Sequence, residues 1–141
     1  MTTYHSNEAI LQLPNLIRPV VDLTRHCLQV VTEEGAELQL VIERSHATTS
    51  LSAALEADLA ERRRSLRGFE LASVTEREYP EVMGSEVRST FVEKERGPVF
   101  AHEFHCVIGG THVAYACSCR LAQAAACDAW MQTMLHYLRL R

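Results

Sequence analysis

The segment 102–106, His-Glu-Phe-His-Cys, combines the residue types of a metal site. Its second histidine comes one residue too early for the helical zinc motif His-Glu-x-x-His, and the surrounding pattern predicts a strand, in which successive side chains point to opposite faces. His102 and Cys106 then share one face while His105 points away, so the three cannot bind one ion. His112 lies across the next predicted hairpin and offers a second ligand, but a third is lacking. We expect no metal site.

The five cysteines indicate core packing rather than thiol chemistry. Each lies inside an apolar stretch, where a reduced cysteine behaves as a small hydrophobic residue. Cys117 and Cys119 share one strand face but are too far apart for an unstrained disulfide. The full set is Cys27, Cys106, Cys117, Cys119 and Cys127. We expect these thiols to stay reduced.

The chain shows no catalytic or cofactor-binding pattern. It has no G-x-S-x-G nucleophile motif, no phosphate-binding glycine loop and no dinucleotide fingerprint. A cysteine nucleophile needs an activated and accessible thiolate, and the sequence singles out none. We therefore expect no catalytic residue, no cofactor and no enzymatic activity. One enzymatic alternative stays open, a cleft in which several of His102, His105, Cys106 and His112 meet.

Length and charge favour one acidic domain, residues 1–141. The 141 residues suit an ordinary domain, and 47% hydrophobic with 23% charged residues is typical of a folded globular chain. A net charge of −4 gives no broad attraction to nucleic acid. The basic run Arg62–Arg64 lies beside Asp58 and Glu61, and is predicted to be a solvated helix face.

No sequence feature predicts export or membrane insertion. Residues 1–6 lack the basic and apolar regions of a signal peptide. Apolar runs fall well short of the roughly 20 residues that a membrane-spanning helix needs. The odd cysteine count lacks the spacing of a secreted disulfide scaffold. We expect a bacterial cytoplasmic protein that does not insert directly into membranes.

Hydrophobic periodicity and turn residues predict nine elements in the order β-β-β-α-β-β-β-β-α. The predicted strands are 7–13, 25–32, 37–44, 69–79, 82–93, 99–108 and 111–119, and the predicted helices are 51–67 and 122–138. Ser50 or Ser52 is suited to cap the first helix, Gly68 to end it, and Gly109-Gly110 to form a tight hairpin. The expected fold is α+β: a twisted antiparallel sheet of about six to seven strands with two helices on one face.

Several predicted strands are apolar on both faces, which a sheet with one solvated face does not need. Large residues such as Phe100, Phe104 and Tyr115 suit the side beneath the helices. The opposite side carries small or medium groups and two glutamines, and an exposed patch of this kind marks an interaction site. We predict that a client-binding groove on that side contains Cys27, Gln29, Val31, Gln39, Val41, Ala72, Val74, Val107, Ala114 and Ala116.

Nearly the whole chain resembles the small PsbP/DcrB-like proteins that serve as Eag-type chaperones for effectors of type VI secretion systems. The resemblance rests on soft patterns rather than on a catalytic signature. It is carried by Asn7-Glu8-Ala9-Ile10-Leu11-Gln12-Leu13-Pro14, by Asp22-Leu23-Thr24-Arg25-His26-Cys27-Leu28, by Leu40-Val41-Ile42-Glu43-Arg44, and by the helix 51–67 with Gly68-Phe69-Glu70-Leu71. His26, Cys27 and Val20-Val21 depart from the residues common in that family.

The resemblance implies a cytosolic homodimer whose concave sheet faces shield the N-terminal transmembrane helices of a secreted effector before export. Small groove residues would let such a helix approach closely, and Gln29 and Gln39 would bond its polar atoms. The alternative function is a binding module for a lipid or another apolar small molecule, which requires an enclosed pocket.

Overall fold

The chain forms the predicted succession of strands and helices, with three further short strands. The computed structural model describes residues 1–24 and 26–141, so the first residue of the predicted strand 25–32, Arg25, lies outside the described residues. The elements in chain order are β1 (Thr2–His5), β2 (Ala9–Leu13), β3 (Val21–Thr24), β4 (Cys27–Val31), β5 (Glu37–His46), α1 (Leu51–Ser65), β6 (Glu70–Glu78), β7 (Met83–Glu93), β8 (Gly97–Ile108), β9 (Thr111–Arg120), the short 3-10 helix η1 (Leu121–Gln123), α2 (Ala124–Tyr137) and β10 (Arg139–Leu140).

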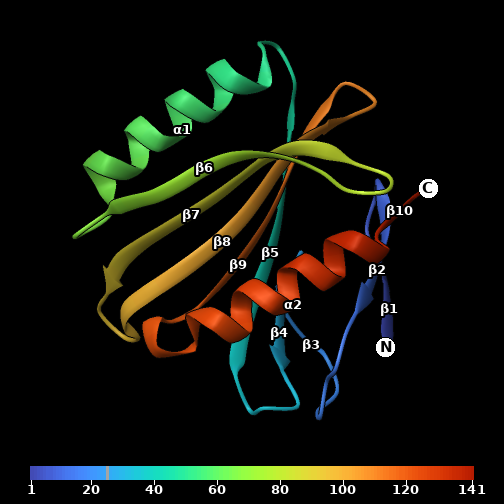
Figure 1. The fold of residues 1–141 in the computed structure, drawn as a ribbon. Helices are drawn as coiled ribbons and strands as arrows, with labels where there is room; N and C mark the ends of the chain where they lie inside the picture. Colours follow the sequence, from blue (N-terminus) through green and yellow to red (C-terminus); the bar gives the residue numbers. More distant parts are fainter. Residues whose placement is uncertain (25) are drawn as a thin grey trace.

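Seven strands form one antiparallel sheet in the order β3-β4-β5-β9-β8-β7-β6. The long strands twist across the molecule in Figure 1. The α+β class and the predicted strand number of the sheet are therefore confirmed. The segments β1, β2 and β10 form a separate three-stranded sheet, which brings the first and last parts of the chain together.

The predicted helix cap at Ser50 and the predicted hairpin turn at Gly109-Gly110 both form in the structure. The hydroxyl of Ser50 accepts the backbone N–H of Ala53 at 3.2 Å and caps α1. Gly109 and Gly110 have φ values of 55° and 79°, the left-handed conformation that a two-residue hairpin between β8 and β9 demands. These signals are confirmed because each one depends on chemistry that neighbouring residues supply.

The short strands were not predicted, because their pairing is decided by distant segments. The strand β3 follows two prolines and pairs at the sheet edge with β4. The two residues of β10 pair with β2, more than a hundred positions earlier in the chain. Pairing of this kind leaves no local pattern in a four-residue or two-residue stretch.

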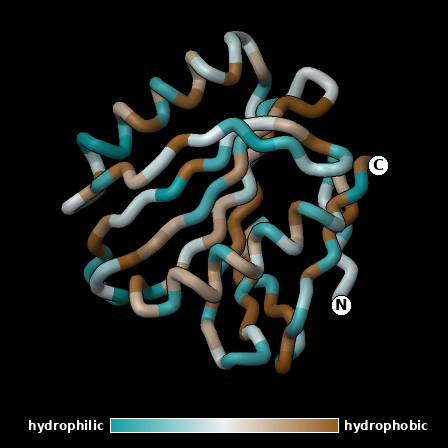
Figure 2. Tube along the Cα trace, in the orientation of Figure 1, coloured by the Kyte–Doolittle hydropathy of each residue, from teal (hydrophilic) through white to brown (hydrophobic). Residues whose placement is uncertain are grey.

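One face of the large sheet carries the main core, beneath α2 and the small sheet. Phe104 pairs with Tyr115, which pairs with Ile42, and all three side chains are buried on this side. The helix α2 contributes Trp130 and Met131 to the same cluster. Figure 2 shows hydrophobic and hydrophilic residues alternating along the strands, as this one-sided burial requires.

The opposite face of the sheet lies against α1. Leu55 and Leu59 pack on Val87 of β7, in a smaller cluster that Phe69 and Leu71 extend. The prediction that both helices share one face is therefore wrong: α1 and α2 lie on opposite sides of the sheet (Figure 1). The cause lies in β7 and β8, which bury side chains on both faces, so each face provides an apolar site for one helix.

Gly84 holds β7 against β8 at a close approach. A Cβ at this position would lie 2.0 Å from the carbonyl oxygen of His105, which is backbone and cannot rotate away. We expect Gly84→Ala to lower the free energy of unfolding by ~1–3 kcal/mol, the usual cost of overpacking. Urea unfolding followed by circular dichroism measures it, with Ser85→Ala on the same strand as the control. Equal stability of the two variants would contradict this contact.

Candidate functional site

The face that carries α1 is only partly covered by that helix. Helix α1 packs over β6, β7 and β8, and leaves β9, β5 and β4 beside it. On these three strands, paired residues form two adjacent rows without charge. We call them the floor: Cys27, Val41 and Ala116 in one row, and Gln29, Gln39 and Ser118 in the other. All six side chains are half-buried or exposed.

The predicted groove residues largely share this face. By strand pairing, nine of the ten lie on the α1 side, the exception being Ala72, which falls in a register shift between β6 and β7. Five of the nine belong to the floor. Val74 lies on the edge strand β6, where it pairs with Val87 of β7, so helix α1 separates it from the floor. The other three, Val31, Val107 and Ala114, lie at the ends of the floor. The prediction of an uncovered face needs correction, since α1 occupies part of it.

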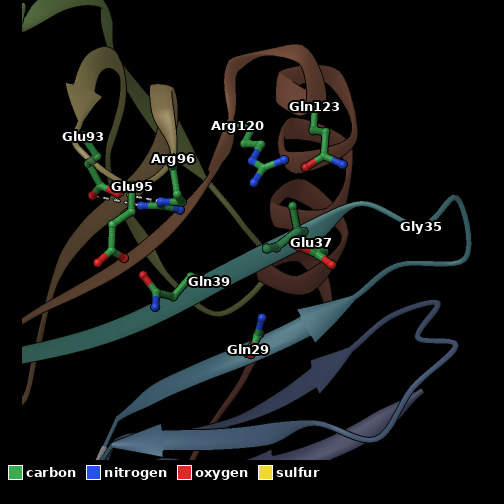
Figure 3. A pocket seen from close by; sticks show the side chains of 10 residues that line it. Gln29, Gly35, Glu37, Gln39, Glu93, Glu95, Arg96, Arg120 and Gln123 are labelled. Carbon is green, nitrogen blue, oxygen red and sulfur yellow. Dashed lines mark hydrogen bonds and ion pairs between the residues drawn. The ribbon is translucent and has the colours of Figure 1, made fainter.

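A polar cleft of about 580 Å³ lies at one end of the floor. Gln29 and Gln39 line it from β4 and β5, and Arg120 lines it from the end of β9 (Figure 3). Arg96, in the β7–β8 turn, donates to Glu93 at 2.6 Å and to the hydroxyl of Ser118 at 3.1 Å. These hydrogen bonds hold the charged turn beside the floor.

A second cleft, of about 390 Å³, lies at the other end, between α1 and the sheet. His105 lines it, with Nε2 3.0 Å from a carboxylate oxygen of Glu103 and Nδ1 3.1 Å from Nε2 of His112. The Glu103 carboxylate accepts a hydrogen bond from Nε2–H of His105. His105 and Glu103 are buried, whereas His112 is half-buried.

Arg62 closes the inner side of this cluster. Its guanidinium binds both carboxylate oxygens of Glu103, one at 2.6 Å, and Asp58 at 2.8 Å. Burial alone raises the pKa of Glu103, but the hydrogen bonds from His105 and Arg62 outweigh it and lower that pKa below its ordinary value. The prediction that the whole basic run is solvated is therefore wrong for Arg62, because this one side chain turns toward the sheet.

The cluster was missed because its parts lie on two elements far apart in sequence. The strand pattern correctly separates His105 from His102 and Cys106, which face the α2 side. It does not show that α1 brings Asp58 and Arg62 to Glu103. A charged residue between apolar positions of a central strand, as at Glu103, is the one available signal, because such a charge needs a partner.

His102 belongs to a separate network that joins α2 to the sheet. Its Nδ1 lies 2.7 Å from Asp128 of α2, and its Nε2 lies 2.8 Å from Glu86 of β7. Arg88 binds both of these carboxylates. The partners of His102 and Arg88 among the described residues are the carboxylates of Glu86 and Asp128, so this network fixes α2 against the sheet.

The cysteines lie where a packing role puts them. Cys106, Cys117, Cys119 and Cys127 are buried and Cys27 is partly exposed, all as free thiols. Burial raises the pKa of Cys106 to about 12, which leaves its thiol protonated and a poor nucleophile at neutral pH.

No helix among the described residues is both long enough and apolar enough to cross a membrane.

Comparisons with known proteins identify the fold. No protein-family model matches the sequence, and no curated protein matches it. Solved structures do match. PA94 of Pseudomonas aeruginosa, a protein of unknown function, aligns with TM-score 0.69 and 17% identity over 100% of this chain and 97% of its own. LpqN of Mycobacterium tuberculosis, which is involved in cell envelope biogenesis, aligns with TM-score 0.69 and 9% identity over 99% of this chain and 89% of its own.

A third match is cyanobacterial PsbP (CyanoP) of Synechocystis sp. PCC 6803, with TM-score 0.59 and 9% identity over 99% of this chain and 92% of its own. The alignments with all three structures cover nearly the whole chain. At such low identities the likeness concerns architecture alone. The chain has a PsbP/DcrB-like fold.

Proposed function

We propose that this protein is a cytoplasmic, non-enzymatic chaperone that holds an apolar helical segment of a secreted protein on the floor beside α1. In its specific form, the client is the N-terminal transmembrane region of a type VI secretion effector. One observation carries the proposal: a continuous uncharged surface of mostly small and amide side chains lies open next to a helix, with a cleft at each end.

The length of strand β5 suits a membrane-spanning helix, although the floor takes up only its middle, from Gln39 to Val41, with Glu37 and Glu43 on the same face on either side. Strand β5 has ten residues, Glu37–His46, which extend about 33 Å at 3.3 Å per residue. A helix of ~20 residues is about 30 Å long, the thickness of the hydrocarbon core that it spans. A client helix lying along β5 would reach from the polar cleft to the cleft of His105.

The side chains of the floor suit the same occupant. Ala116, Cys27 and Ser118 are small, and small residues let a helix backbone approach closely. Gln29 and Gln39 pair across β4 and β5 and carry donors and acceptors for polar atoms of the client. Because an apolar helix is costly to expose to water, covering a few hundred Å² of it at ~25 cal/mol per Å² stabilises the complex by several kcal/mol.

The resemblance to Eag-type chaperones adds the homodimer to the proposal, since two floors facing one client would enclose it. The fold neighbours are compatible with this assignment but do not carry it. The larger cleft beside the floor is lined mainly by charged and amide side chains, and the smaller one has charged groups and two histidines at its rim beside three alanines. They favour a polypeptide with polar ends over the lipid alternative, which requires an enclosed apolar pocket.

The test is client capture by a floor variant. We expect the double variant Val41→Asp and Ala116→Asp to lose client solubilisation, because two paired positions in the middle of the floor would then carry charge. The protein is co-expressed with the effector encoded beside its gene, and the complex is measured by co-purification and native mass spectrometry.

The control carries the same change on the same face, outside the floor. Val74→Asp lies beyond α1 on the edge strand β6 and is 46% exposed. It should retain the client, and circular dichroism should show both proteins folded. Unchanged capture by a folded Val41/Ala116 variant, or loss of capture in Val74→Asp alone, would reject the floor as the binding surface.

A further inference from the structure

We propose that Glu37 and Glu43 select clients whose apolar helix carries lysine or arginine near both ends. This inference rests on the proposed function, because it concerns the two ends of the same floor. It names a second recognition element: the floor binds the apolar part of the helix, and the two carboxylates bind its basic flanks.

The two glutamates lie on one strand and on one face. On β5, Glu37 and Glu43 share the α1 face with the floor residues between them, because alternate residues of a strand point to the same side. These floor residues, Gln39 and Val41, are half-buried, whereas both glutamates are exposed. One carboxylate therefore follows each end of the uncharged stretch of β5.

The end of the floor at Glu43 carries an excess of negative charge. The guanidinium of Arg62 binds two carboxylates at once, those of Asp58 and Glu103. Glu43 lines the same cleft as Asp58 and forms no ion pair with any described residue. Three carboxylates thus share one guanidinium on this side of the sheet.

Two other groups near Glu43 leave this excess in place. Arg44, the next residue of β5, points to the opposite face and binds Glu8 there. Partial burial and the neighbouring His105 lower the pKa of His112, so the His112 ring adds no positive charge at neutral pH.

The end of the floor at Glu37 is acidic as well. Glu37 and Glu95 line the larger cleft together with Arg120 (Figure 3). Arg96 in the same cleft donates to Glu93 at 2.6 Å, so the charges of these two residues cancel. Two further carboxylates then face one further guanidinium. Negative charge at both ends, on a chain of net charge −4, complements a partner with positive ends.

The spacing of the two carboxylates suits the flanks of a membrane-spanning helix. Glu43 follows Glu37 by six positions, a distance of about 20 Å at 3.3 Å per residue. A membrane-spanning helix is about 30 Å long, so it extends past each glutamate by about one turn. Lysine and arginine are common near the ends of such helices, and their long stems let the charge reach back over this distance.

The experiment measures the binding of two dye-labelled model peptides to the full chain by fluorescence anisotropy at pH 7.5. Both peptides have an apolar core of about 20 alternating leucine and alanine residues, and one carries two lysines at each end where the other carries two aspartates. We expect the wild type to bind the lysine peptide at least ~3-fold more tightly, the combined effect of two exposed ion pairs. The preference should fade in 1 M salt, where the Debye length is about 3 Å.

Charge reversal gives the decisive comparison. The double variant Glu37→Lys with Glu43→Lys should prefer the aspartate peptide. The matched control, Glu56→Lys with Glu70→Lys, makes the same change of net charge at exposed positions on α1 and at the start of β6, and should keep the preference for lysine. Circular dichroism establishes that both variants fold.

The outcomes separate this inference from the proposed function. Equal binding of the two peptides by the wild type, or reversal in the control as well, would overturn the role of Glu37 and Glu43. The floor would still stand if the double variant Val41→Asp and Ala116→Asp then lost both peptides. Failure of the wild type to bind either peptide would reject the floor and this inference together.

Discussion

Replacing Arg62 with methionine will lower the free energy of unfolding by about 3–5 kcal/mol at neutral pH, the usual effect of removing one partner from a buried ion pair. Only 4% of the Glu103 side chain and 20% of the Arg62 side chain are exposed. Without the guanidinium, a carboxylate with little access to water loses its charged partner and keeps only the hydrogen bond from His105. Equilibrium unfolding in urea, followed by circular dichroism, measures the difference.

Helix α1 provides a matched control. Arg64 forms a comparable pair with Glu61, but these side chains are 75% and 61% exposed, so Arg64→Met should change the unfolding free energy by less than about 1 kcal/mol. Similar losses in the two variants would show that the Arg62–Glu103 pair has no special role.

The loss of unfolding free energy in Arg62→Met should also depend on pH. In the wild type the pKa of Glu103 is lowered, so its contribution to stability is present above the unfolded pKa near 4.5 and is lost as the pH falls through the folded pKa. In the variant the hydrogen bond from His105 remains but the lowering by Arg62 is lost, so the pKa of Glu103 is higher than in the wild type and its carboxyl group takes up a proton at a higher pH. The gap between the two proteins should therefore be widest at neutral pH and narrow toward pH 4.

Trp130→Ala is expected to cost about 3–5 kcal/mol, the range for deleting a buried aromatic side chain. Trp130 is 4% exposed, and its indole N–H donates to the carbonyl oxygen of Pro14 at 2.9 Å. The variant leaves both a cavity beneath α2 and a buried carbonyl without its donor. Because Trp130 is the only tryptophan, circular dichroism must replace fluorescence as the probe.

Two control variants separate the contributions of ring volume, hydrogen bonding and burial to the effect of Trp130→Ala. Trp130→Phe keeps most of the aromatic volume but not the N–H, so it should lose clearly less than Trp130→Ala. Tyr137→Ala removes a ring on the same helix that is 48% exposed, and should cost under about 1 kcal/mol. If Trp130→Ala and Tyr137→Ala unfold at the same urea concentration, the indole does not anchor α2 to the segment after β2.

The sequence predicts the long elements well because their signals are local. Helix α1 has its Ser50 cap and leucines at helical spacing, and β8 and β9 have the Gly109-Gly110 turn. The two-sided burial of the central strands is also visible in the sequence. Which helix covers which face is not, because that choice depends on how Leu55 and Leu59 meet Val87, a contact between elements that no local period encodes.

The site divides in the same way. The shared face of Cys27, Gln29, Gln39, Val41 and Ala116 follows from strand alternation and correct register, and so was predictable. The cluster of His105, His112 and Glu103 with residues of α1 was not, since it needs the helix on that face. Because α1 was predicted on the same face as α2, its contacts with Glu103 were missed and the predicted groove was too large.

The small sheet of β1, β2 and β10 has a practical consequence for handling the molecule. It packs with α2 on the side of the large sheet opposite the floor, and both ends of the chain emerge from it. A dye, affinity tag or surface tether joined to either end therefore departs from the rear of the molecule. Immobilised through either end, the protein will present its floor to solution.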